Sequence, residues 1–363
     1  MMTDDPSATR RVIGGVDTHK DIHVAVVIDD LGRRLDAASF ATTTAGYRDC
    51  YRWLGGYGEI LAVGVEGTGS WGAGLSRYLR GRGLNVVEVN RTNRQTRRRK
   101  GKTDIVDAEA AARAVLAGEA LVTPKAGDGP IEALRQLRLA RNGAIKAHTA
   151  AANQLHSLTD TAPDELRTRL RGLTTLQRAR TCARLRAGDV FTPAGAAKRA
   201  LRSVATRWLS LHAEIAELDH AIRQILDRIA APLLERYGVG YETAGALLCA
   251  AGDNPERLAT EGSFAALCGS TPVPISTGKT DRLRLNRAGD RTANSALWTI
   301  VMSRIAAKHP PTVAYIERRT TEGRSKRAAI RCLKRYVARQ LYNDIRAITT
   351  TNTNTNEDTK LAA

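Results

Sequence analysis

The chain of 363 residues is long enough for two or three domains, and its 56 Lys and Arg against 37 Asp and Glu give a formal net charge of +19. So many positive charges repel one another unless a polyanion neutralises them, so we expect a nucleic-acid partner. Because aromatic residues are only 4%, we expect contacts with phosphate to dominate over stacking on bases. No apolar run could span or target a membrane, and five widely spaced cysteines argue against a disulfide framework or a zinc site, so we expect a soluble, cytoplasmic, nucleoid-associated protein without a membrane partner.

Residues 11–125 alternate short β-branched runs with helical segments. The predicted order is strand 12–17, strand 23–29, a third strand within 32–40, helix from 45, strand 60–67, helix 72–82, strand 84–89, a basic loop and a helix from 102. This is the order of the ribonuclease H-like α/β fold, in which the first and fourth strands are central neighbours. We therefore predict that fold for the N-terminal domain.

The stretch "KTDIVDAEAA", residues 102–111, sets two acids directly behind a basic run. On a helix, a spacing of three places the carboxylates of Asp104 and Asp107 on one face, where they repel each other unless a cation lies between them. A simpler interpretation is a helix N-terminus, where Asp is favoured by the helix dipole and the basic residues are solvated.

Two further acids favour the metal-site interpretation. Asp17 ends the first predicted strand and Glu66 ends the fourth, so both should lie beside the acidic face of the later helix. Carboxylate oxygens are the ligands that Mg²⁺ or Mn²⁺ prefers, and such ions can activate a phosphodiester. Each acid alone is also explained as a strand-end or helix-capping residue. The preceding cations are predicted to hold the phosphate backbone near the site: Arg97, Arg98, Arg99, Lys100 and Lys102.

Residues 129–231 predict a helical, coiled-coil middle region. From Leu201 to Ile229 apolar residues recur in alternating steps of three and four, which is typical of a coiled coil. Residues 131–158 form a weaker stripe that could be an antiparallel partner within the chain. The pattern predicts a stalk and a dimer, and ordinary packing of two helices within one globule remains the alternative.

Residues 232–346 predict a mostly α-helical third domain. The turn at Gly238 and Gly240 before a helix resembles the helix-hairpin-helix elements that present backbone N–H groups to phosphates, although it is also explained as a tight turn. The segment 269–294 is predicted to be an irregular functional loop that binds nucleic acid through Lys279, Arg282 and Arg287. The polar tail, residues 347–363, is predicted to be disordered.

Within that loop, "PISTGKT" presents Ser276 before a glycine that lets the backbone turn sharply. A hydroxyl becomes a nucleophile only when a base, a metal or nearby cations activate it, and a flexible turn explains the motif equally well. The motif lacks the first glycine and the preceding strand of a P-loop, which argues against nucleotide hydrolysis.

The motifs "GVDTHKD", "VEGTGSWG" and "KTDIVDA", followed by "GSTPVPISTGKTDRLRLNRAGDR", resemble the DEDD transposases of the IS110 insertion-sequence family over about residues 11–346. The resemblance implies a RuvC-like DEDD domain and a transposase domain with a catalytic serine, which recombine donor and target DNA under the direction of a bridge RNA. It implies metal ligands at Asp17, Glu66, Asp104 and Asp107, and a nucleophile at Ser276, with Thr277 leaving the register open by one residue. A dimer or tetramer is expected.

Two other functions remain open. A metal-dependent, structure-selective endonuclease resembling Holliday-junction resolvases would use the acids alone to activate water, and would not need Ser276 in a basic loop. A non-catalytic nucleic-acid scaffold is disfavoured because all four acids are present.

Overall fold

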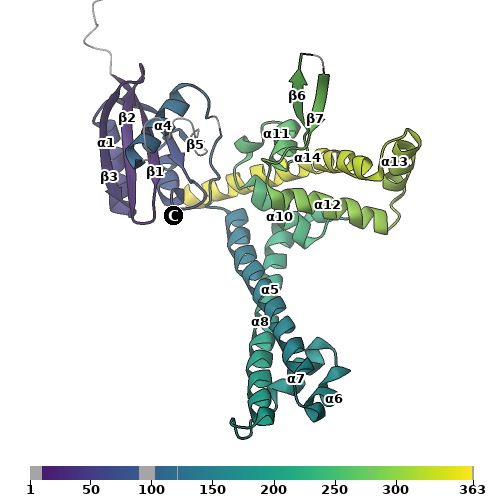
Figure 1. The fold of residues 1–363 in the computed structure, drawn as a ribbon. Coiled ribbons are helices and arrows are strands. Elements are labelled where there is room, and N and C mark those ends of the chain that lie inside the picture. Colours follow the sequence, from purple (N-terminus) through teal and green to yellow (C-terminus); the bar gives the residue numbers. More distant parts are fainter. Residues whose placement is uncertain (1–9, 90–102, 121, 279, 362–363) are drawn as a thin grey trace, which may run out of the picture. The chain divides into compact units, whose positions relative to one another are not determined.

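The computed structural model describes residues 10–89, 103–120, 122–278 and 280–361 (Figure 1). Its N-terminal elements are β1 (Arg11–Thr18), β2 (Ile22–Asp29), β3 (Arg34–Ala41), α1 (Thr44–Gly55), β4 (Glu59–Glu66), α2 (Ala73–Arg80), β5 (Val86–Val89) and α4 (Asp104–Leu116). The middle contains α5 (Pro130–Asp160), α6 (Asp164–Arg171), α7 (Thr175–Ala183), α8 (Pro193–Ile229) and α9 (Ala231–Leu234). The remainder contains α10 (Tyr241–Ala251), η1 (Pro255–Leu258), α11 (Glu261–Leu267), β6 (Val273–Thr277), β7 (Thr280–Arg284), α12 (Arg291–Ala306), α13 (Pro310–Thr321) and α14 (Lys326–Leu361).

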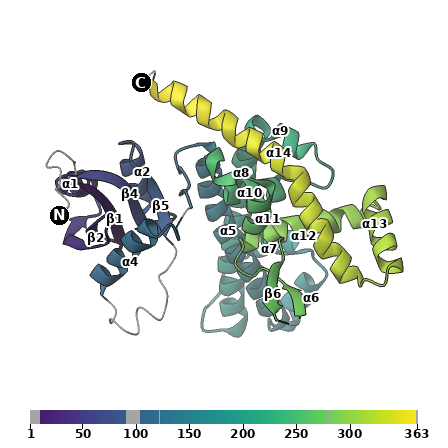
Figure 2. The same cartoon turned by 90° about the horizontal axis from the view of Figure 1, so that it is seen from above.

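The five-stranded sheet has the order β3-β2-β1-β4-β5, with β1 antiparallel to β2 and parallel to β4. This confirms the predicted ribonuclease H-like arrangement, including the central pairing of the first and fourth strands. Helices α1 and α2 cover one face of the sheet and α4 covers the other (Figure 2). Because both faces are covered, β1 and β4 are almost continuously apolar rather than alternating.

The chain divides into two compact units, and residues 232–346 contribute to both of them. The first unit combines Met1–Gly129 with Ala250–Gly289 and Ala338–Ala363, and the second combines Pro130–Cys249 with Asp290–Val337. Within the first unit, the side chain of Arg257 donates to the carbonyl of Thr123 at 2.8 Å, and the side-chain amide of Asn254 donates to the carbonyl of Pro124 at 3.1 Å. These long-range bonds, which local patterns do not predict, tie the segment after α10 to the N-terminal fold.

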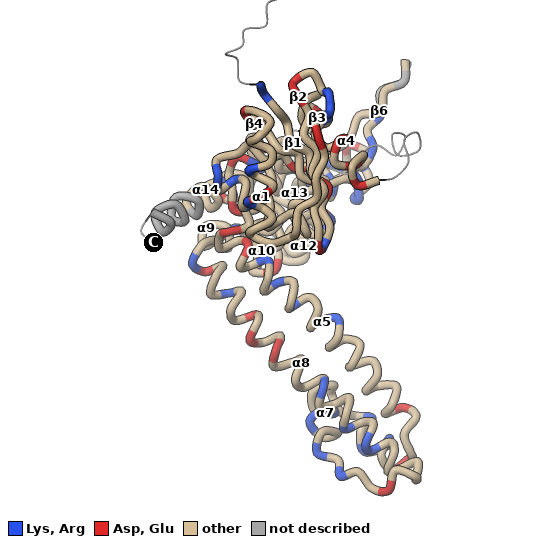
Figure 3. Tube along the Cα trace, turned by 90° about the vertical axis from the view of Figure 1, so that its left-hand side faces the viewer, with Lys and Arg blue, Asp and Glu red and all other residues tan. Residues whose placement is uncertain are grey.

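In the second unit, α5 and α8 pack against each other along an antiparallel hairpin (Figure 3). Arg141 pairs with Asp219 near one end and Arg207 contacts Gln154 near the other, which fixes the antiparallel direction. The predicted partner within the chain is therefore confirmed. Of the heptad stripe, Leu201, Trp208 and Ile222 are buried, whereas the positions between Trp208 and Ile222 are half-buried, so self-association through the stripe stays a prediction.

Two predictions about loops are wrong. Segment 269–294 contains an antiparallel hairpin, β6–β7, because two runs that each suit a strand follow each other closely in the sequence. The tail 347–363 is helical as far as Leu361, since α14 continues through it. Ile348 and Thr349 are buried, and extending an existing helix costs much less than starting one.

Candidate active site

The site begins where two parallel strands end side by side. Val16 of β1 pairs with Val65 of β4, so the next residues, Asp17 and Glu66, occupy neighbouring positions at the same edge of the sheet. Asp17 is 9% exposed and Glu66 is half-buried. The hydroxyl of Thr18 donates to the backbone carbonyl of Glu66 at 2.8 Å, which links the two strand ends.

Helix α4 lies unusually close to this edge because glycines and alanines face each other. A Cβ atom added at Gly15 would lie 2.1 Å from the carbonyl oxygen of Ala108 and 2.4 Å from the nitrogen of Ala112. The helix begins at Asp104, after the hydroxyl of Thr103 accepts the N–H of Val106 as its cap. Small residues at the interface therefore set the distance of the first turn of α4 from β1.

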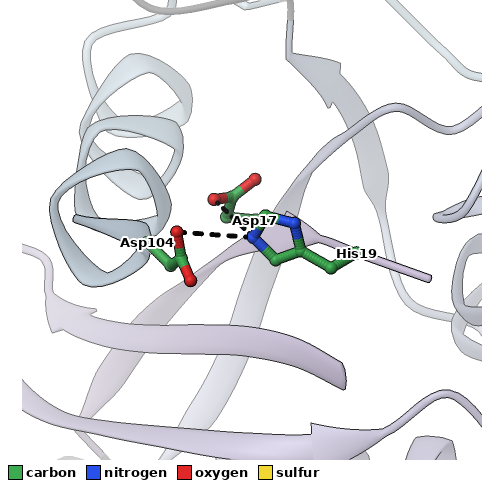
Figure 4. A group of neighbouring side chains, drawn as sticks. All are labelled: Asp17, His19 and Asp104. Atoms are coloured by element: carbon green, nitrogen blue, oxygen red, sulfur yellow. Dashed lines mark ion pairs between the residues drawn. The ribbon is translucent and has the colours of Figure 1, made fainter. Parts of the chain in front are cut away.

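Three side chains from these elements meet at one point (Figure 4). Nε2 of His19 lies 3.3 Å from Oδ2 of Asp17 and 3.4 Å from Oδ1 of Asp104. Neither contact has hydrogen-bond geometry, although this ring nitrogen is itself buried. Asp107 follows one turn later on α4 and is buried, at 3% exposed.

The electrostatics of the site favour an additional cation. Burial raises the pKa of Asp17 above its usual value; the charge of His19 lowers it, and the charges of Asp107 and Asp104 raise it. A raised pKa means that the ionised carboxylate is disfavoured where it stands. A divalent ion would reverse this, because it attracts ionised carboxylates and supplies the charge that they lack.

The structure brings together two of the four predicted acids and adds one residue that the sequence interpretation left out. Among the described residues, donor atoms of Asp17, His19 and Asp104 lie within 4.8 Å of one another, and neither Glu66 nor Asp107 belongs to this group. The signal for His19 was its spacing: it follows Asp17 by two residues at a strand end, where alternate residues point to the same face. The basic run 97–102 lies outside the described residues.

The predicted nucleophile lies on the β6–β7 hairpin. Ser276 is exposed and pairs with Asp281 across the two strands. Arg282 pairs with Ile275, so by alternation it projects from the face of the hairpin opposite to Ser276. Lys279 lies outside the described residues, and Arg287 is exposed in the segment after β7. On this geometry the side chain of Arg282 does not lie on the face of the hairpin that carries Ser276.

Two models of known protein families match the chain. Residues 14–162 match the model of a DEDD transposase family, and residues 230–317 match a family described as Transposase IS116/IS110/IS902. Among curated proteins none matches the chain. Within the described residues, no helix combines the length and the apolar character needed to cross a lipid bilayer.

Proposed function

The chain belongs to the IS110 family of transposases, enzymes that cut DNA strands and transfer them, and we propose that it does so with a carboxylate-bound metal site and a serine nucleophile. The metal ligands are Asp17, Glu66, Asp104 and Asp107, and the nucleophile is Ser276. The observation that carries the proposal is the convergence of Asp17 from β1 and Asp104 from α4 on one ring nitrogen, that of His19.

These residues fit a divalent ion. Their donor set is rich in carboxylate oxygens, as Mg²⁺ and Mn²⁺ prefer, and the buried nitrogen of His19 faces two of them without making a hydrogen bond. When bound there, such an ion would polarise the phosphodiester and stabilise the charge that develops on its oxygens. His19 then serves to share the charge of the two carboxylates and to keep them oriented.

Ser276 would make the transfer reversible. Its Oγ forms a bond to phosphorus as the bond from phosphorus to the departing DNA oxygen breaks, so one strand end stays joined to the protein as a phosphoserine. The serine loses a proton and the released DNA hydroxyl gains one. Because one phosphodiester replaces another, rejoining needs no ATP. The metal-dependent nuclease is the alternative, since water in place of Ser276 would release free ends.

The partners follow from the family and from the charge. We propose donor and target DNA as substrates, a bridge RNA as the guide, and a dimer or tetramer as the working assembly. The net charge of +19 supports polyanionic partners of either kind.

The experiment uses labelled DNA, the RNA that copurifies with the protein, and Mg²⁺, analysed on denaturing gels. Wild type should give a protein-linked strand that is absent from Ser276→Ala, from Asp17→Asn and from Asp104→Asn. Asp49→Asn is the matched control for Asp104→Asn, because Asp49 is 55% exposed and Asp104 53%, yet Asp49 lies on α1. Cleavage to free ends by Ser276→Ala at the wild-type rate would replace the serine mechanism with the nuclease.

A further inference from the structure

The far end of the α5–α8 hairpin is a small helical body, which shares its apolar core with Ala151 and Leu155 of α5. We call it the helical cap, residues 160–207: α6, α7 and the first turns of α8. Its core includes Leu166, Leu170, Cys182 and Leu201. Arg178 is buried, at 5% exposed, and its guanidinium donates to the carbonyls of Leu170 and Leu173, which satisfies the end of α6. The cap is therefore a stable platform.

The surface of the cap around its tip loop carries unbalanced positive charge. The loop, residues 184–192, joins α7 to α8. It contains Arg184 and Arg186, and it is followed on α8 by Lys198, Arg199 and Arg202. Between residues 184 and 202, Asp189 is the one acidic residue. The structure gives none of these cations an ion pair with a described residue. Arg199 and Arg202 lie three apart on one helical face, where like charges repel unless a bound anion compensates them.

The tip loop also holds an aromatic ring in solvent. Phe191 is 94% exposed, and Val190 beside it is 48% exposed. The loop is ordered by its own bonds: the Phe191 N–H donates to the carboxylate of Asp189 at 3.0 Å, and the Thr192 hydroxyl donates to the Asp189 carbonyl at 2.8 Å. The loop therefore holds two adjacent apolar side chains, Val190 and Phe191, in solvent, where they are available to a ligand.

We propose that the helical cap binds single-stranded RNA, with its arginines on phosphates and Phe191 stacked on an unpaired base. Guanidinium groups next to an exposed aromatic ring are the combination by which proteins bind unpaired nucleotides. Duplex DNA offers no free base face without unstacking, whereas folded RNA presents unpaired bases in its loops. The cap therefore fits an RNA loop better than the DNA substrate.

This inference deepens the proposed function by giving the RNA partner a docking site. Its test measures RNA affinity in the full-length protein without any DNA cleavage. If variants of the cap bind RNA normally, the proposed carboxylate and serine chemistry is unaffected. If the variants of the carboxylates and of the serine still cleave DNA, RNA binding by the cap is unaffected.

The probes are a fluorescein-labelled RNA hairpin with a uridine-rich loop, the same RNA stem without a loop, and duplex DNA, each followed by fluorescence anisotropy. Phe191→Ala should weaken binding of the hairpin by about 5- to 150-fold, the range for loss of one stacked base, and should not change binding of the stem. Phe191→Trp should retain the affinity. The double variant Arg199→Gln, Arg202→Gln should reduce the slope of log K against log salt by about 0.7 for each lost phosphate contact.

Matched controls lie outside the cap. Leu139→Ala removes an apolar side chain that is 62% exposed on α5, and Arg48→Gln removes an exposed cation on α1; neither should change the RNA affinity. The proposal is overturned if Phe191→Ala binds the hairpin as tightly as wild type does. It is also overturned if the variant loses as much affinity for the stem and for duplex DNA as it loses for the hairpin. If Phe191→Ala lowers the mass of the oligomer but leaves the RNA affinity unchanged, the cap instead binds a second copy of the chain.

Discussion

The close approach of α4 to Gly15 of β1 gives a sharp test of how this helix positions its acids. In Gly15→Ala, the new Cβ would lie 2.1 Å from a backbone oxygen and 2.4 Å from a backbone nitrogen of α4. Non-bonded atoms pack at about 3.5 Å, and backbone atoms cannot rotate away as a side chain can, so the helix has to retreat by about 1 Å. Overpacking of this kind costs about 1–3 kcal/mol of folding free energy.

The same retreat displaces Asp104 and Asp107, which lie on the first turns of α4. A misplacement of about 1 Å can lower a catalytic rate by about 100-fold, so Gly15→Ala should lose most strand cleavage even though every carboxylate is retained. Urea unfolding measures the stability, and DNA cleavage at saturating Mg²⁺ measures the activity under conditions where the variant is folded.

Gly14→Ala is the matched control on the opposite face of the same strand. Its Cβ would meet only side-chain atoms, at 3.0 Å from Leu54 and 3.2 Å from Val63, and these can yield by a few tenths of an ångström. It should cost less stability and leave the cleavage rate near that of wild type. If Gly15→Ala cleaves as fast as Gly14→Ala, then the close approach of α4 does not position the site.

Three further predictions concern pH, assembly and salt. Burial lowers the pKa of His23, which is fully buried with neither ring nitrogen hydrogen-bonded; the unfolded chain therefore binds more protons below about pH 6.5. As the pH is lowered below about 6.5, the free energy of unfolding should therefore fall by up to about 1.4 kcal/mol per pH unit, and it should fall less steeply in His23→Phe. Urea titrations at pH 7.5 and pH 5.5 would measure both slopes. Ile215→Asp should convert a dimer to a monomer with unchanged helicity, whereas Ile222→Asp, at a site 4% exposed, should destabilise the hairpin itself; light scattering and circular dichroism separate the two, and a monomeric wild type would contradict the first. Replacing Arg97, Arg98 and Arg99 by Ala should flatten the salt dependence of DNA binding, and an unchanged slope would mean that these cations do not touch phosphate.

The order of elements in the N-terminal fold was predictable because its signals are local. Runs of β-branched residues and punctuating glycines mark strands and their ends within a few residues, and the heptad stripe marks α8 in the same way. Two acids of the site, Asp17 and Asp104, were likewise recognisable from their positions at the end of a strand and the start of a helix.

Only the tertiary structure decided what those acids lie beside. His19 lies beside both Asp17 and Asp104 because α4 packs so closely on β1 that Gly15 has no room for a Cβ atom. No local pattern in the sequence encodes that distance. The same holds for the segment after α10, tied to the N-terminal fold by Asn254, and for Ser276, whose hairpin turns Arg282 to its other face. Patterns along the chain report which face of an element is apolar, whereas the neighbours of that face come from packing between residues far apart in sequence.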